Sequence, residues 1–380
     1  MKVLHISDQP PGYLSGGQLG ILQFSYAWTH AVDQVDYIGP SFNNKEIKSW
    51  YNQCYFLDRK PNIIQKIWSL CHLQFDRKYL SWKKMDFDFA RYDLIYIDFT
   101  KMDYAIKDIK KSRYKGKVIV RAHNVEADFF RVNFLSRKSI MTFLKYIVAK
   151  PRERYMVRTA DCILAITEQD KERLVELYSI PSNKIEICPV GINIPSQEMK
   201  FKTELSQKLK CLITGTLSFG PNADATLWFV EKVYPLVKDI ADVTIAGYKP
   251  NNDLKRKCKE NNIKLVDSPE TMRPLFEAAE MFCAPIFEGG GMKVKIAEAM
   301  SYGLPIVTTT HGAIGYDLIN RQNCYISDTA EGFAEAIKEY ISMNDETRIE
   351  FLRNEWKNYC DKFSLHAIRD RMIELIRRFS

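Results

Sequence analysis

The chain has 380 residues, enough for about two domains. Hydrophobic residues make up 46% of it and aromatic residues 12%, so the chain has ample apolar surface to bury, and a disordered protein is excluded. The net charge of +8 is concentrated in the first half. Residues 101–158 hold 16 lysines and arginines against 5 carboxylates, which indicates an anionic partner for this region.

The sequence contains no predicted targeting or crosslinking feature. No stretch reaches about 18 consecutive apolar residues, which excludes a predicted membrane-spanning helix. The opening residues Met1–Ser7 lead straight into a strand-like run instead of a signal peptide. The nine cysteines are scattered and form no Cys-x-x-Cys pair, which favours reduced thiols over a disulfide framework or a zinc site. These features favour a cytoplasmic location.

Short apolar runs alternate with segments of helix length throughout the chain. The runs are rich in Val, Ile, Leu and Tyr, and several are apolar nearly throughout, as parallel strands covered by helices on both faces are. The alternation predicts an α/β protein with doubly wound parallel sheets. The predicted strands are Val3–Ser7, Val35–Ile38, Leu94–Asp98, Lys117–Arg121, Cys162–Thr167, Cys211–Thr214, Val243–Ala246, Lys264–Val266, Met281–Ala284, Pro305–Thr308 and Cys324–Ile326.

A break in this pattern predicts two Rossmann-like domains. Residues 189–197 (PVGINIPSQ) have two prolines, a glycine and no helical period, and a new strand follows them. We expect a first domain over 1–195 and a second over 196–362. The segment 363–380 contains an amphipathic helix that we expect to cross back to the first domain. Two such domains facing a cleft would bind ligands beyond the carboxyl ends of their strands.

The segment 285–305 (PIFEGGGMKVKIAEAMSYGLP) is the strongest candidate for a ligand site. Three glycines follow a predicted strand and precede a predicted helix, so the backbone can approach a ligand closely, and the amides that begin the helix favour an anion. Lys293 and Lys295 add positive charge there, and Glu298 lies one turn after Lys295. This arrangement suits a nucleotide sugar, with cations at the diphosphate and the carboxylate at the ribose hydroxyls. A glycine-rich loop beside a solvated helix face is the alternative.

This segment resembles the donor-binding motif of retaining GT-B glycosyltransferases of family four. Their pattern is a Glu, seven residues, and a second Glu followed by Ala-Met/Ala-x-Gly-x-Pro, and Glu298–Pro305 (EAMSYGLP) matches its second half. Gly290 stands where the first Glu is expected, and Glu288 lies two residues earlier. The resemblance implies that the first domain is the acceptor side and that the second binds the nucleotide-sugar donor. It implies that Glu298 faces the ribose. It also implies that Glu288, if a longer loop restores its place, faces the donor sugar.

Two further loops match the family by position. The loop 215–222 (GTLSFGPN) follows the first strand of the second domain and resembles the family's loop beside the donor phosphates. The family's Arg and Lys after this strand are missing, and Lys293 and Lys295 are the candidates to replace their charge. Residues 15–18 (SGGQ) resemble the first-domain glycine loop. An ordinary turn remains an alternative for each loop.

His123 lies in the run Arg121–Glu126 (RAHNVE), at the carboxyl end of a predicted strand. Family enzymes carry a His here, so the resemblance assigns His123 to positioning the donor sugar, with Asn124 and Glu126 as further contacts. A histidine that merely caps a loop is the alternative.

The resemblance implies a retaining glycosyltransferase that moves a sugar from a nucleoside diphosphate sugar to a hydroxyl, in cell-surface polysaccharide or lipid-linked glycan synthesis. A catalytically idle nucleotide-sugar-binding subunit and a nucleotide-sugar epimerase on the same fold are alternatives. No metal or other cofactor is required, because Asp86-Phe-Asp88 does not follow a strand and is best explained as a chance D-x-D match. The predicted catalytic residues are His123, Lys295 and Glu288, and the predicted donor-binding residues are Gly16, Gly17, Gly215, Thr216, Gly289, Gly290, Gly291, Met292, Lys293, Val294, Lys295 and Glu298.

The basic stretch 131–158 mixes cations with Phe, Leu, Ile, Met and Tyr. It has the composition of a helix that lies on an anionic membrane, within reach of a lipid-linked acceptor. A core helix with a basic outer face is the alternative. The expected partners are a nucleotide-sugar donor and a glycan, lipid-linked or protein-linked acceptor. No nucleic-acid-binding module is present, so nucleic acid is not an expected partner, and peripheral attachment at the inner face of the membrane stays open beside a purely cytoplasmic location.

Overall fold

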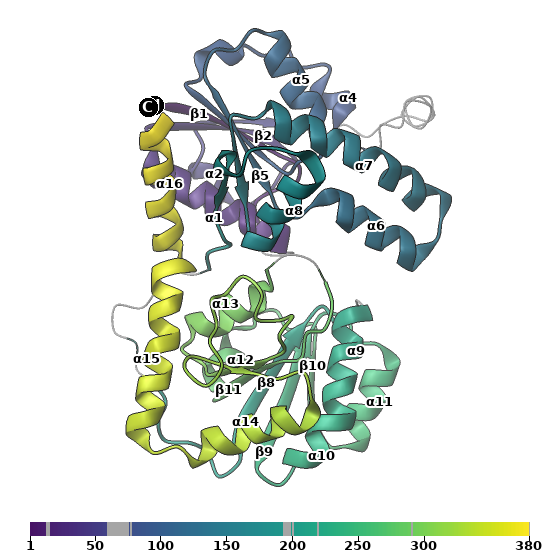
Figure 1. Ribbon diagram of the computed structural model, residues 1–380, viewed down its shortest axis with the longest axis vertical. Coiled ribbons are helices and arrows are strands. Elements are labelled where there is room, and N and C mark those ends of the chain that lie inside the picture. The colour runs from purple at the N-terminus through teal and green to yellow at the C-terminus, as the bar shows by residue number, and fades with distance from the viewer. Residues whose placement is uncertain are drawn as a thin grey trace. The chain divides into compact units, whose positions relative to one another are not determined.

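The computed structural model divides the chain into two compact units, 1–190 with 368–380, and 191–367. Figure 1 shows a parallel sheet flanked by helices in each unit. The described residues are 1–12, 16–58, 76, 78–192, 199, 201–218, 220–289 and 292–379.

Unit 1 contains a seven-stranded sheet in the order β3-β2-β1-β4-β5-β6-β7, and every neighbouring pair is parallel. Ser7 on β1 pairs with Asp98 on β4, which pairs with Arg121 on β5. The carboxyl ends of the three central strands therefore lie level with one another. The strands are β1 (Lys2–Ser7), β2 (Gln34–Gly39), β3 (Gln53–Phe56), β4 (Leu94–Asp98), β5 (Lys117–Ala122), β6 (Cys162–Ala165) and β7 (Ile185–Ile187).

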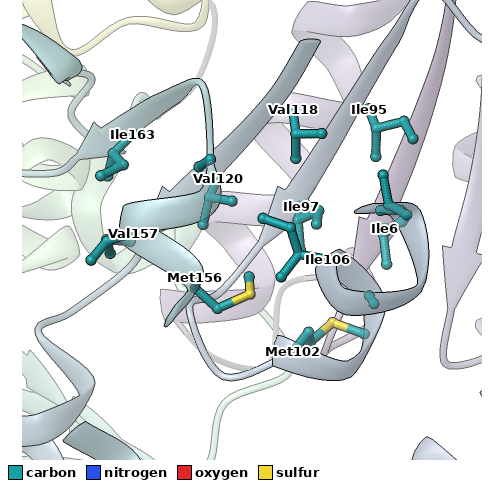
Figure 2. Packing of buried hydrophobic residues seen from close by; sticks show 14 of the residues in the cluster. Ile6, Ile95, Ile97, Met102, Ile106, Val118, Val120, Met156, Val157 and Ile163 are labelled. Atoms are coloured by element: carbon teal, nitrogen blue, oxygen red, sulfur yellow. The ribbon is translucent and has the colours of Figure 1, made fainter. Parts of the chain in front are cut away.

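Helices pack on both faces of this sheet, as its apolar strands require. Figure 2 shows one side of the core, where isoleucines and valines of the strands meet Met102, Ile106, Met156 and Val157. Helices α6 and α7 run side by side as a hairpin that extends away from the sheet (Figure 1). The helices of unit 1 are α1 (Gly16–Ala31), α2 (Lys45–Ser49), α4 (Tyr79–Trp82), η1 (Phe89–Arg91), α5 (Asp103–Lys111), α6 (Glu126–Arg137), α7 (Ile140–Thr159), α8 (Glu168–Tyr178), η2 (Ser182–Lys184) and α16 (Leu365–Phe379).

Helix α16 packs against unit 1. Its Ile368, Met372 and Leu375 are buried in the same cluster as Trp28 of α1 and Val35 of β2. This confirms the predicted return of the C-terminal helix to the first domain, and burial of the apolar stripe explains it, because the stripe recurs at three- and four-residue steps.

Unit 2 contains a six-stranded parallel sheet in the order β10-β9-β8-β11-β12-β13. Its elements are β8 (Leu209–Gly215), α9 (Gly220–Trp228), the π-helical η3 (Phe229–Val233), α10 (Tyr234–Val237), β9 (Ala241–Gly247), α11 (Asn252–Glu260), β10 (Lys264–Asp267), α12 (Arg273–Ala278), β11 (Met281–Ala284), α13 (Val294–Ser301), β12 (Ile306–Thr308), β13 (Tyr325–Ile326), α14 (Ala330–Ser342) and α15 (Asp345–Lys362).

The predicted fold class, two doubly wound parallel sheets, is confirmed. Every predicted strand is present, and the structure adds the edge strands β3 and β7. The predicted strand 162–167 ends at Ala165, because the Thr167 side chain accepts a hydrogen bond from the Asp170 amide and caps α8 instead.

Candidate functional site

The glycine-rich segment of unit 2 connects β11 to α13. Strand β11 ends at Ala284 and α13 begins at Val294. Gly290 and Gly291, which we expected to contact the donor, lie outside the described residues. Lys295 and Glu298 are half-buried on the same helix, one turn apart, as the sequence predicts.

Lys295 reaches the carboxyl end of the neighbouring strand β8. Its Nζ donates hydrogen bonds to the Thr214 carbonyl oxygen at 3.1 Å and to Asn222 Oδ1 at 3.2 Å. Burial lowers the pKa of Lys295 to about 8, and the positive charge of Lys293 contributes to this shift. The ammonium therefore has two neutral acceptors and no carboxylate among the described residues within ion-pair distance, and an anionic ligand would stabilise its charge.

The loop after β8 is held beside this ammonium. The Asn222 Nδ2 amide donates to the Thr216 carbonyl oxygen at 3.3 Å, so Asn222 bridges Lys295 and the loop. A Cβ placed on Gly215 would come within 3.4 Å of Lys295 Nζ. The structure therefore brings Gly215 and Thr216 together with Lys295, although these segments are about 80 residues apart in the sequence.

Glu298 provides a second polar group on the same helix. Burial raises the pKa of Glu298 to about 7. Its carboxylate has no hydrogen-bond or ion-pair partner among the described residues. A half-buried carboxylate without a protein donor is suited to accept hydrogen bonds from the hydroxyls of a ligand.

The other predicted residues of unit 2 lie in the segment between β11 and the first residue of α13. Lys293 Nζ donates to the Gly289 carbonyl oxygen at 2.6 Å, and His311 Nε2 lies 2.8 Å from the same oxygen. Gly289 has φ +109°, a conformation that favours glycine. Met292 is buried and Val294 half-buried, whereas Glu288 is exposed. His311 was not predicted, because it lies 18 residues beyond Lys293 and matches no motif.

In unit 1 the candidate residue His123 contacts a buried carboxylate, that of Asp98 at the end of β4. The Asp98 carboxylate accepts hydrogen bonds from His5 Nε2 at 2.6 Å, His123 Nε2 at 2.7 Å and the Tyr96 hydroxyl at 3.1 Å. Burial would raise the pKa of Asp98, but the bonds from His123 and His5 hold it below its usual range.

The surroundings of His123 favour the neutral form of its ring. Burial lowers the pKa of the His123 imidazole, although the hydrogen bond to Asp98 acts in the opposite direction. Since Nε2 donates to Asp98, Nδ1 of the neutral ring is a hydrogen-bond acceptor. Asp98 therefore fixes both the tautomer and the orientation of His123.

Glycines of α1 let that helix approach His123. A Cβ on Gly20 would lie 3.1 Å from His123 Cε1, and one on Gly17 would lie 3.3 Å from Phe99 Cζ. Phe99 stacks on the His123 ring with centroids 4.0 Å apart. The predicted Gly17 and His123 thus belong to one cluster, and Gly16 is the first residue of α1. Strand-end position points to Asp98, but no sequence signal marked Gly20 or His5.

The described part of the chain was compared with the requirements of a metal site and of a membrane-spanning helix, and it meets neither. Within these ranges, no group of three or more His, Cys, Asp or Glu side chains is placed to hold a metal ion. None of the helices described has the length and apolar character needed to cross a bilayer.

Two family models match the chain. The model described as Glycosyltransferase Family 4 matches residues 16–195, and the one described as Glycosyl transferases group 1 matches residues 208–343. Together they match most of the sequence and both units. The chain belongs to the family-four type of glycosyltransferases, which have the GT-B fold. The glycosyltransferase has its predicted donor motif, Lys295 and Glu298, within the second matched segment.

Solved structures share the fold of this glycosyltransferase over its whole length. Sucrose-phosphate synthase from Thermosynechococcus elongatus is 14% identical, with a TM-score of 0.71 over 99% of this chain and 98% of that one. HepE of Anabaena in complex with UDP is 12% identical, with a TM-score of 0.68 over 100% of both chains. WaaG, a glycosyltransferase involved in lipopolysaccharide biosynthesis, is 13% identical, with a TM-score of 0.65 over 99% of both.

A curated relative also matches this chain by sequence. It is an uncharacterised 44.6 kDa protein in the cps region of Klebsiella pneumoniae, 24% identical over 254 residues. The glycosyltransferase spans 63% of the length of that relative, and the match covers 63% of this chain.

Proposed function

We propose that this glycosyltransferase moves a sugar from a nucleoside diphosphate sugar to an acceptor hydroxyl with retention of anomeric configuration. The observation that carries the proposal is the pair on α13: the Lys295 ammonium beside the Gly215 loop, and one turn later the Glu298 carboxylate without a protein donor. A cation and a free acceptor at this spacing suit the two polar parts of a nucleotide, its diphosphate and its ribose.

The donor is assigned to unit 2. Lys295 and Lys293 would contact the diphosphate, Glu298 would accept hydrogen bonds from the ribose hydroxyls, and Gly289 and Gly215 would admit the backbone close to the phosphates. HepE, which shares the fold, is described in complexes with UDP and with UDP-glucose, so uridine nucleotides are the first donors to test.

The chemical step transfers the anomeric carbon between two oxygens. Its bond to the diphosphate oxygen breaks, a bond to the acceptor oxygen forms on the same face, and the acceptor proton passes to the departing diphosphate. Negative charge grows on the diphosphate in the transition state, where preorganised cations have their largest effect. The proposal gives this role to the ammonium of Lys295, with that of Lys293, and it requires no metal.

His123 is proposed to position the transferred sugar. Its neutral ring is held by Asp98, so Nδ1 is available to accept a hydrogen bond from a sugar hydroxyl. Glu288 is exposed and has no assigned contact, so a sugar-facing role for Glu288 stays a prediction of the family motif.

A role in cell-surface polysaccharide or lipid-linked glycan synthesis is the proposed context. It is supported by the Klebsiella relative in the cps region and by the fold shared with WaaG. The α6–α7 hairpin fits this context. Residues 126–159 hold eight lysines and arginines against three carboxylates, and two of these carboxylates, Glu126 and Glu153, are buried.

The hairpin is proposed to lie on an anionic lipid surface. Apolar side chains are exposed along it, and Ile140 at the start of α7 is 81% exposed. Exposed apolar groups among cations are the pattern of a helix that inserts at a charged membrane surface. The exposed large apolar residues of the hairpin are Phe129, Val132, Leu135, Ile140, Met141, Phe143, Ile147 and Tyr155.

Incubation with radiolabelled UDP- and GDP-sugars tests the proposed activity. Release of the nucleotide together with a labelled glycan is the expected result, and Lys295→Ala and Glu298→Ala should abolish it. Lys338→Ala and Glu350→Ala, which change exposed residues of unit 2, are matched controls. Tight nucleotide binding without release would instead support an idle subunit, and conversion of the sugar without release would support an epimerase.

A further inference from the structure

Two buried histidines of unit 1 share one carboxylate. His5 of β1 is fully buried, and His123 is 5% exposed. His5 Nε2 lies 2.6 Å from Asp98 Oδ2, and His123 Nε2 lies 2.7 Å from Asp98 Oδ1. Within the described part of the chain, neither ring pairs with any other carboxylate. The single negative charge can therefore compensate at most one imidazolium, and the ring that carries the second proton determines the state of the other.

The second nitrogen of His5 begins a chain of buried hydrogen bonds. His5 Nδ1 lies 3.2 Å from the hydroxyl of Tyr51, which precedes β3. The Tyr51 hydroxyl donates to Ser25 Oγ on α1. Ser25 Oγ donates to the Ile21 carbonyl oxygen at 2.7 Å. All four residues are buried, so each bond depends on the protons that these groups supply.

The end of this chain fixes the direction of every bond in it. A carbonyl oxygen only accepts, so the Ser25 hydroxyl proton lies on the bond to Ile21. The proton between Tyr51 and Ser25 is therefore the one of Tyr51. The Tyr51 oxygen has no proton left for His5, so it accepts, and His5 Nδ1 carries a proton.

The bond on the other side of the His5 ring also needs a proton. At 2.6 Å, Nε2 and Asp98 Oδ2 cannot face each other with two lone pairs. The proton belongs either to His5, as an imidazolium beside a carboxylate, or to a neutral Asp98. Asp98 also accepts from His123 and from the Tyr96 hydroxyl, and hydrogen bonds to a carboxylate favour its ionised form. The geometry therefore favours the imidazolium of His5.

Tyrosine rings surround the His5 imidazole. The ring centroids of Tyr37, Tyr51 and Tyr96 lie 5.8, 6.0 and 5.2 Å from that of His5. These rings take the place of water, so the two N–H groups of His5 depend on Tyr51 and Asp98 for acceptors. A buried ion pair is tolerated when its remaining protons are hydrogen-bonded, and the Tyr51 oxygen meets that condition.

We propose that His5 carries the second proton of this cluster and is a positioning residue for His123. The His5 imidazolium compensates the Asp98 carboxylate, so the charge that would otherwise favour a second proton on His123 is already balanced. His123 then keeps one proton, on Nε2, and its Nδ1 stays an acceptor for a hydroxyl of the transferred sugar. Burial, and with it the charges of Arg121 and Lys101, lower the pKa of His123 in the same direction. The inference rests on the proposed role of His123 and names the residue that maintains it.

Nitrogen NMR of the whole chain, labelled with ¹⁵N in its histidine rings, tests the assignment at pH 7. The shift of a ring nitrogen shows whether it carries a proton. Both nitrogens of His5 should carry one, and His123 should carry one on Nε2 only. Loss of signals in His5→Gln and in His123→Gln assigns the two rings. A single proton on His5 would place the shared proton on Asp98 and overturn the proposal.

His5→Gln tests the positioning role. The glutamine amide can still donate to Asp98, but it brings no charge. His123 should then gain a second proton on Nδ1, which the same NMR measurement detects. Because a protonated Nδ1 cannot accept a hydrogen bond, turnover of radiolabelled sugar should fall about 10-fold or more, while the Kd for UDP stays within about two-fold.

Tyr51→Phe and Tyr37→Phe form a matched pair. Each removes one buried hydroxyl beside the His5 ring, but the Tyr37 hydroxyl donates to the Pro40 carbonyl oxygen at 3.1 Å and has no bond to His5. Tyr51→Phe should cost His5 its Nδ1 proton and shift His123 toward the doubly protonated form, and Tyr37→Phe should do neither. Identical His123 signals in His5→Gln, Tyr51→Phe and the unmodified chain would overturn the positioning role.

The failures of this inference and of the proposed function are distinguishable. If His5→Gln does not fold, the spectra of the unmodified chain and of Tyr51→Phe still decide between the two assignments. If sugar is transferred but His5 carries one proton, the inference fails and the proposed function stands. If His5 carries two protons but no sugar is transferred, the proposed function fails and the assignment of the protons stands.

Discussion

The buried charges at the strand ends are compensated by protein groups in unit 1 but not in the described part of unit 2. In unit 1 the Asp98 carboxylate is fully buried and receives three hydrogen bonds from protein groups, and the two bonds from His123 and His5 hold its pKa low. In unit 2 burial moves the pKa of both Lys295 and Glu298 toward neutrality, and no countercharge within the described ranges offsets this shift. The first arrangement stabilises the fold and orients His123, whereas the second leaves interactions for a ligand to complete. Substitutions should therefore cost folding free energy in unit 1 and ligand affinity in unit 2.

The largest expected effect is on the stability of unit 1. Asp98→Ala leaves two buried histidines without their shared acceptor, and removing one partner of a buried charged network typically costs about 3–5 kcal/mol. Urea unfolding followed by circular dichroism measures this loss. UDP binding by unit 2 should persist at urea concentrations below the unfolding transition. An unchanged unfolding midpoint would show that the cluster does not stabilise the fold.

The next effect is on donor affinity. Lys295→Ala removes a charge-assisted contact to the diphosphate, which is typically worth about 1.5–3 kcal/mol, so the Kd for UDP should rise about 10- to 100-fold. Because the pKa of Lys295 is about 8, the affinity of the unmodified chain should fall as the pH rises above 8, and the variant should lack this dependence. Calorimetry with Lys338→Ala as the control measures both. A loss of stability equal to the loss of affinity would contradict a ligand-directed role.

His123→Ala separates positioning from binding. The imidazole is proposed to contact the transferred sugar, so turnover should fall by about 10-fold or more while the Kd for UDP stays within about two-fold, a difference of about 1.4 kcal/mol in the barrier. Gly20→Ala offers a second route to the same result, because its Cβ would crowd the His123 ring edge. Equal losses of turnover and nucleotide affinity would count against this role.

Glu298→Gln should have a pH-dependent effect on stability. The folded-state pKa of about 7 lies above the ordinary value of 4.5, so the folded chain binds more protons between these values and loses stability as the pH rises through this window. Glutamine cannot ionise, so the variant should be more stable at pH 8, by about 1 kcal/mol, and equally stable at pH 4. Thermal unfolding at the two pH values measures the difference. The same variant should bind UDP more weakly at pH 8.

The smallest effect concerns the hairpin. Lys138→Ala should weaken binding to phosphatidylglycerol vesicles by about 1 kcal/mol and should leave the weak binding to phosphatidylcholine vesicles unchanged. Co-sedimentation with the vesicles measures both. Lys338→Ala, on unit 2, should change neither. Binding that is equal for the two lipids would show that charge does not direct the contact.

The sequence predicts the strands of both sheets well, because buried parallel strands are continuous apolar runs. It misses β3 (QCYF) and β7 (IEI), which are short edge strands with half-exposed residues and no such run. The position of Lys295 and Glu298 on one helix face follows from the helical repeat. The bonds from Lys295 to Thr214 and Asn222 do not, since they depend on how β8, α9 and α13 pack.

In unit 1, too, contacts between residues far apart in the sequence do not follow from local patterns. His123 is predictable from its place at a strand end, but its partners His5 and Asp98 meet it through the pairing of β1, β4 and β5. The four hydrogen bonds to Glu153 join residues between 25 and 53 positions away along the chain, and no local pattern marks that glutamate as a helix cap.

The Glu153 carboxylate also has a mechanical consequence. It joins the loop after β4, the first turn of α6, the body of α7 and the last turn of α8 through four hydrogen bonds. The base of the hairpin is therefore clamped to the sheet, and the hairpin cannot tilt as a rigid arm without either breaking this clamp or displacing Glu126. A displacement of the far end of the hairpin is therefore opposed by these four hydrogen bonds and is transmitted to the first turn of α6, where Glu126 lies.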